Sequence, residues 1–134
     1  MVCIYCGHKT NIINSRHQKR LNQKWRRHRC QSCGAVFTTI EAFELSSTLL
    51  VTKGKKTTAF DRETLFISVY ESVKHRPTGI QDAKALTDTI IASLAPQSER
   101  ATLTRKKIIG TTADTLKKFD KAAHTHYLAY HPLS

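Results

Sequence analysis

Two different hydrophobic patterns divide the chain. In its first third, β-branched and aromatic residues gather in short runs at residues 10–13, 25–30 and 36–40, which predicts three short strands. From residue 61 onward, apolar residues recur every three or four positions, which is typical of amphipathic helices. The pattern therefore predicts an α+β protein, with a small antiparallel sheet followed by a helical part.

The helical part is predicted to contain a β-hairpin and four helices. The hairpin covers residues 49–60 and turns at residues 53–56. Asp61 is a natural N-cap for the first helix, and Thr102 or Thr104 can cap the third. The expected limits of the helices are residues 61–77, 79–96, 102 or 104 to 119, and 120–132. Prolines at three of these limits explain why the helices should end there.

Composition adds a charge that the apolar pattern does not show. The 134 residues include 22 Lys+Arg against 10 Asp+Glu, a formal net charge of +12, which predicts an anionic partner and nucleic acid before an acidic membrane or a polyanionic ligand. Eight of these basic residues lie in residues 1–40, which contain no acid at all. Apolar runs are too short to span a bilayer, and no secretory signal pattern is present, so an intracellular protein is expected.

Four cysteines form two pairs with the spacing Cys-x-x-Cys. The pairs are Cys3 with Cys6 and Cys30 with Cys33, and a glycine follows each pair. Two such turns can point four thiolates at one ion, and four thiolates leave no coordination position for water or substrate. The spacing predicts a structural Zn²⁺ in a zinc ribbon, with two disulfides or four free thiols as the alternative. His8 and His28 lie beside the pairs and are interpreted as surface groups.

Basic residues concentrate between the two cysteine pairs. They are Arg16, Lys19, Arg20 and Lys24, followed by the run Arg26, Arg27, His28, Arg29, which Trp25 precedes. Alternation along a strand places Trp25, Arg27 and Arg29 on one face, and Arg26 and His28 on the other. Cations without neighbouring acids suit a phosphate backbone, and arginine can also read guanine edges. The alternative is a solvated face that only keeps the protein soluble.

Several of these segments resemble the NrdR family, bacterial transcriptional repressors of ribonucleotide reductase genes. The segments similar to the family's zinc ribbon are residues 3–10, 14–16, 26–30 and 37–41. Residues 51–53, 60–65 and 74–77 resemble its second domain, the ATP-cone. The similarity extends over nearly the whole chain.

The resemblance implies a zinc-ribbon DNA-binding domain over residues 1–45 and an ATP-cone over residues 46–134 that binds nucleotides and forms oligomers. It implies double-stranded operator DNA as partner, Zn²⁺ as cofactor, ATP or dATP as regulatory ligand, and a homo-oligomer whose size follows the nucleotide. The resemblance implies a protein of the bacterial cytoplasm that is associated with the nucleoid and does not bind a membrane. By position, the DNA-binding residues are Arg16, Trp25, Arg26, Arg27, His28 and Arg29. The nucleotide-binding residues are Val51, Lys53, Lys55, Lys56 and Phe60, with the lysines facing phosphates.

The basic turn from Lys53 through Gly54 to Lys55 and Lys56 is one residue shorter than the corresponding turn of the family. A glycine turn of this kind can bring backbone N–H groups and ammonium groups to a triphosphate. Without the resemblance, the same turn is typical of a solvated hairpin tip.

Three functions remain open from the sequence. A nucleotide-responsive DNA-binding repressor explains both halves of the chain. A zinc-ribbon protein that binds RNA or the ribosome would use the helical part for protein contacts, and a regulatory fragment of a nucleotide enzyme is the third reading. No catalytic motif is present, so no enzyme is expected. His124, His126 and His131 are expected to have surface or capping roles, because positions two apart on a helix diverge.

Overall fold

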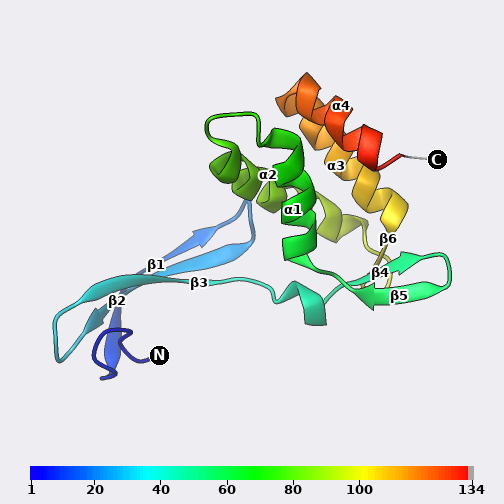
Figure 1. Ribbon diagram of the computed structural model, residues 1–134. Coiled ribbons are helices and arrows are strands. Elements are labelled where there is room, and N and C mark those ends of the chain that lie inside the picture. Colours follow the sequence, from blue (N-terminus) through cyan, green and yellow to red (C-terminus); the bar gives the residue numbers. More distant parts are fainter. Residues whose placement is uncertain (133–134) are drawn as a thin grey trace. The chain divides into compact units, whose positions relative to one another are not determined.

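The computed structural model describes residues 1–132 and divides the chain into two compact units, Met1–Phe43 and a second one that begins at Glu44 (Figure 1). Each unit has its own sheet and its own buried cluster. In the part of the chain that the structure describes, no helix combines the length and the apolar character that crossing a membrane requires.

The first unit is a three-stranded antiparallel sheet. Its strands are β1 (Thr10–Gln18), β2 (Gln23–Cys30) and β3 (Val36–Glu41), in the order β1-β2-β3. β1 is longer than the apolar run predicts, because polar residues continue the pairing with β2 as far as Gln18 opposite Gln23. The register shifts between Ile12 and Asn14, so β1 contains a bulge there. The three predicted strands are all confirmed.

The second unit begins with a hairpin and continues with helices. Its elements are η1 (Leu45–Ser47), β4 (Leu50–Lys53), β5 (Lys56–Ala59), α1 (Arg62–Val73), α2 (Gly79–Leu94), η2 (Ala95–Gln97), β6 (Thr102–Thr104), α3 (Arg105–Phe119) and α4 (Lys121–Tyr130). Asp61, Thr104 and Asp120 accept backbone N–H bonds at the starts of α1, α3 and α4. The predicted α+β fold, its hairpin and its four helices are confirmed.

The short strand β6 was not predicted. Thr102 lies inside it, and Thr104 caps α3. β6 pairs in parallel with β4, with Thr52 opposite Thr104, and the sheet order is β5-β4-β6 (Figure 1). Three residues are too few for an alternating pattern to be read from the sequence. Their fully buried Leu103 belongs to the main core, which also contains Phe60, Val69 and Ile90.

An ion-pair network joins the helix ends of this unit. Arg76 follows α1 and pairs with Asp82 of α2 at 2.9 Å and with Asp120, the cap of α4, also at 2.9 Å. His75 lies 3.3 Å from the same Asp120 carboxylate. The Arg76 guanidinium also lies 4.6 Å from the centre of the Phe119 ring. These contacts hold the α1–α2 connection against the junction of α3 and α4.

Candidate functional site

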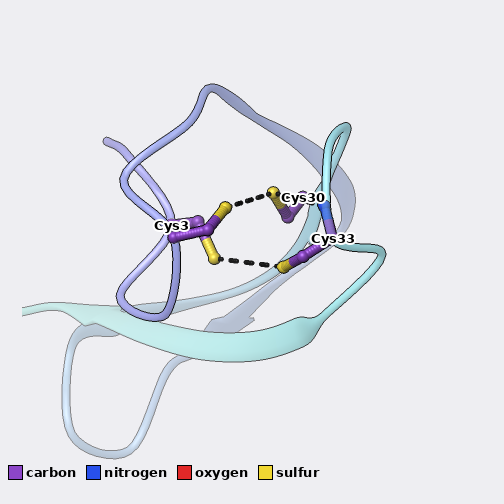
Figure 2. A group of neighbouring side chains, drawn as sticks. Cys3, Cys30 and Cys33 are labelled. Atoms are coloured by element: carbon purple, nitrogen blue, oxygen red, sulfur yellow. Dashed lines mark hydrogen bonds between the residues drawn. The ribbon is translucent and has the colours of Figure 1, made fainter.

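The four cysteines converge on one point in the first unit. Their sulfur atoms all lie within 4.8 Å of one another, with 3.8 Å between Cys3 and Cys33 and 3.4 Å between Cys6 and Cys30. Figure 2 shows Cys3 facing Cys33 from the opposite knuckle. A tetrahedral ion with bonds of about 2.3 Å requires sulfurs about 3.8 Å apart. The observed spacing therefore fits a four-thiolate metal site.

The backbone conformation of the two knuckles positions these sulfur atoms. Gly7 and Gly34 have φ of 77° and 74°, which a glycine adopts without the steric cost of a Cβ atom. Their amides donate to the carbonyl oxygens of Cys3 and Cys30 at 2.9 Å and 3.2 Å, so each knuckle closes as a tight turn. The amide of Ser32 also donates to the Cys30 sulfur at 3.3 Å.

The pKa values of two thiols in the cluster are shifted in opposite directions. The Cys33 amide, which donates to the Cys30 sulfur, lowers the pKa of Cys30 to about 6. At Cys6 the His8 amide acts to lower the pKa, but the Cys30 sulfur and desolvation act against it, and the pKa rises to about 11. One thiolate therefore forms readily, whereas its neighbour resists a second negative charge nearby. A cation at the centre would remove that conflict, because it stabilises all four thiolates together.

One face of the first sheet carries most of the predicted DNA-binding residues. Directly opposite residues of neighbouring strands share a face, so Arg16, Trp25 and Ile40 form one row and Arg27 and Thr38 lie on a second. The Arg16 guanidinium lies 6.0 Å from the centre of the Trp25 ring. Arg29 shares this face by alternation, and the side chains of Arg27 and Arg29 are exposed.

The opposite face carries the acidic residue of the sheet. Glu41 is the sole acidic residue of residues 1–43, and it pairs across the strands with Lys24. Arg26 lies on this side and reaches the Glu41 carboxylate at 3.5 Å. The face with Arg16, Trp25, Arg27 and Arg29 is therefore positive without a compensating acid; we call it the basic face.

The interpretation of His28 as a surface group was wrong. Its exposed fraction is 5%, its ring stacks on Phe37 with 5.1 Å between ring centres, and Nε2 lies 2.7 Å from the Thr39 hydroxyl. Nδ1 lies 3.4 Å from the Thr10 hydroxyl. Both ring nitrogens are engaged inside the ribbon, so a DNA contact from His28 does not fit this arrangement. His8 is exposed, as predicted, and its Nδ1 lies 3.3 Å from the Cys6 sulfur.

A pocket of about 380 Å³ lies in the second unit. It is lined by Thr52, Lys53, Gly54, Thr104, Arg105, Lys106, Ile109 and Pro132. The first three residues belong to β4 and its turn, and the next three to the end of β6 and the start of α3. The parallel pairing of β4 with β6 brings these segments together although about 50 residues separate them.

Of the predicted nucleotide-binding residues, Lys53 alone lines this pocket. Lys55 and Lys56 lie beyond it on the hairpin, and Val51 packs against the core. Phe60 lies outside the pocket lining: its side chain is 2% exposed within the core, and its amide donates to the Leu49 carbonyl. Phe60 ends the hairpin at the point where the chain enters α1, and there an aromatic ring fills the interior.

Sequence reasoning missed Arg105 and Lys106. The available signal was three consecutive basic residues, Arg105 to Lys107, directly after the predicted cap Thr104. Of the three C-terminal histidines, His131 has the expected capping role, since its ring stacks on Tyr127 at 4.3 Å and its amide donates to the Tyr127 carbonyl at 2.9 Å at the end of α4.

The sequence of the chain resembles those of known proteins. The profile of the family described as "Transcriptional repressor NrdR-like, N-terminal domain" matches residues 1–41, the segment that contains both knuckles and all three strands. Proteins named transcriptional repressor NrdR are similar over almost the whole chain. The one from Acetivibrio thermocellus is 30% identical over 128 residues, which cover 95% of this chain and 84% of the relative.

Two further relatives give the same result. The repressor of Syntrophotalea carbinolica is 31% identical over 129 residues, covering 95% of this chain and 81% of the relative. The repressor of Clostridioides difficile is 28% identical over 131 residues, covering 95% and 82%. All three relatives are named as repressors and none as an enzyme, in agreement with the prediction from the sequence. The zinc-ribbon profile and the four-sulfur cluster together support Zn²⁺ as the metal.

Proposed function

Because the chain belongs to the NrdR family of transcriptional repressors, we propose that it represses ribonucleotide reductase genes in response to nucleotides. In this proposal the ribbon binds double-stranded operator DNA. ATP or dATP binds in the second unit and controls the oligomeric state of the protein, and with it the affinity for DNA. The protein would act in the cytoplasm, on the bacterial nucleoid.

The basic face of the ribbon is the observation that supports the DNA-binding half of the proposal most strongly. Arg16, Arg27 and Arg29 extend from adjacent strands of one small sheet, and the only acid of that unit lies on the other side. Such an arrangement attracts a phosphate backbone from a distance and leaves arginine forks available for guanine edges. Trp25, half-buried beneath Arg16, keeps that guanidinium extended over the sheet.

In this mechanism the metal has a structural role. Cys3, Cys6, Cys30 and Cys33 would hold it, and four thiolates would leave no position for a reacting water. The buried cluster of the ribbon contains only Cys3, Cys30 and Phe37 together with His28, which is too small a core to keep 43 residues folded. Metal binding would therefore supply much of the free energy that keeps the basic face in shape.

The nucleotide half of the proposal depends on the second unit. Its pocket has a volume in the range of small-molecule sites, about 300–1,000 Å³, and Lys53 brings an ammonium group to it. Bound nucleotide would act on DNA affinity through the oligomer, since a ligand shifts an equilibrium only by binding one state better than the other. Lys55 and Lys56 would then face solvent or another copy of the chain.

A gel-shift experiment tests the DNA-binding half. The full chain loaded with Zn²⁺ is titrated against a promoter fragment of its own ribonucleotide reductase genes, a scrambled duplex of equal length and a structured RNA. The proposal expects the promoter fragment to bind most tightly. Tighter binding of the RNA would overturn it in favour of an RNA- or ribosome-binding ribbon.

Light scattering tests the nucleotide half separately. The molar mass of the protein is measured alone, with ATP and with dATP, at the same protein concentration. A change of mass with at least one nucleotide is expected. Identical masses in all three samples would contradict control through oligomerisation and leave the DNA result unaffected.

A further inference from the structure

Three cationic side chains meet at the pocket of the second unit and have no acidic partner there. Lys53 comes from the end of β4, and Arg105 and Lys106 come from the first turn of α3. No carboxylate belongs to the lining. Within residues 1–132, none of the three side chains forms an ion pair. Like charges gathered without a counter-ion repel one another, and a bound anion would relieve this repulsion.

The next residue along α3 behaves differently. Lys107 directs its ammonium group away from the pocket, to the Gln97 carbonyl at 3.1 Å and the Glu99 carboxylate at 3.5 Å. The Lys107 amide donates to the Thr104 hydroxyl at 3.2 Å, so Thr104 caps the helix. Of these three consecutive basic residues, Lys107 is paired with an acid of its own chain, and the other two line the pocket.

The positive charge of Arg105 also acts on a neighbouring helix. Burial raises the pKa of Tyr127 on α4, whereas a hydrogen bond with Thr112 and the positive charge of Arg105 act to lower it. Arg105 itself is exposed beside the pocket, where its guanidinium group is accessible to a bound ligand.

The rest of the lining suits phosphate better than a nucleobase. Thr52 and Thr104 offer hydroxyl groups, and Gly54 offers an open backbone. Ile109 and Pro132 are the apolar members, and no aromatic ring is available for a base to stack on. A ligand with several negative charges and many acceptor oxygens matches this set of donors.

We propose that Lys53, Arg105 and Lys106 form a binding site for a triphosphate chain, in which the two residues of α3 contribute more than Lys55 and Lys56 of the hairpin. The inference rests on the proposed nucleotide response and identifies the residues that bind the phosphates of the ligand. The triphosphate chain is recognised here, so free tripolyphosphate and ATP share the site and AMP binds weakly.

Calorimetric titration of the full chain tests this assignment. The probes are ATP, inorganic tripolyphosphate and AMP, and the variants are Arg105→Gln and Lys106→Gln. Each variant should weaken ATP and tripolyphosphate binding about tenfold, because a bond to a charged group is lost. Lys107→Gln and Lys55→Gln remove the same charge outside the pocket and should stay within about twofold of the parent chain. Melting curves confirm that every variant is folded.

The outcomes separate the two proposals. If ATP binds but Arg105→Gln and Lys106→Gln match the two controls, the triphosphate site is refuted and the nucleotide response stands. If tripolyphosphate binds as expected but ATP does not, the site stands and the nucleotide response is refuted. Equal affinity for AMP and ATP would overturn the triphosphate assignment.

Discussion

Neighbouring residues of β2 have opposite surroundings, although the sequence presents them as one basic run. Arg27 is exposed on the basic face, whereas Arg26 lies on the other face beside Glu41, and His28 is buried against Phe37. The side-chain alternation of a strand produces this difference at a spacing of one residue. The run therefore supplies fewer DNA-contacting side chains than its composition indicates.

This difference can be measured on the full chain. Arg27→Ala is expected to weaken operator binding about tenfold and to reduce the salt dependence by about one phosphate contact, because an exposed cation leaves the basic face. Arg26→Ala removes the same charge from the other face and should have a smaller effect. Fluorescence anisotropy at several salt concentrations gives both quantities. Equal losses from the two variants would contradict the assignment of the basic face.

Phe60 provides a second prediction at the residue scale. Since its ring is buried in the core and lies outside the pocket, Phe60→Leu should lower the free energy of unfolding by about 1–2 kcal/mol. Nucleotide affinity, measured below the melting temperature, should change less than twofold. A large loss of affinity with unchanged stability would show instead that the ring contacts the ligand.

At the scale of elements, the start of α4 depends on one carboxylate. Asp120 accepts from the amides of Ala122 and Ala123 and pairs with Arg76 and His75. The Ala123 amide first, and then Arg76, hold the pKa of Asp120 at about 2. Because this pKa is lower in the folded than in the unfolded chain, the stabilisation is complete above about pH 4 and disappears as the pH falls toward 2.

Asp120→Asn should therefore lower the melting temperature at pH 7 and flatten its decline between pH 4 and pH 2. Thermal melts followed by circular dichroism over this range measure both effects. Asp114→Asn, an exposed position on α3, is the matched control and should leave the profile unchanged. A parallel profile for Asp120→Asn and the parent chain would show that the cap and its ion pairs contribute nothing measurable.

At the scale of the whole molecule, the two units have different sources of stability. The ribbon has a minimal core and depends on its four sulfurs, whereas the second unit has a continuous apolar core between its sheet and its helices. The units should therefore respond differently to removal of the metal.

A strong zinc chelator should abolish operator binding of the full chain and leave most of its helical circular dichroism and its ATP binding. Restoring Zn²⁺ under reducing conditions should restore DNA binding. Metal analysis of the stripped protein serves as the control. Full DNA affinity in protein shown to be free of metal would contradict a structural role for the four cysteines.

The sequence by itself determined the features that depend on neighbours along the chain. The cysteine knuckles with their glycines, the caps Asp61 and Thr104 and the periodicity of the helices arise from interactions a few residues apart, and the structure confirms each of them. Only the tertiary structure decided which residues meet from a distance. Burial of His28 requires Phe37 and Thr39 from another strand, and the pocket requires β6 beside β4. These contacts depend on packing between segments far apart in the chain, and no local pattern of residues encodes such a meeting.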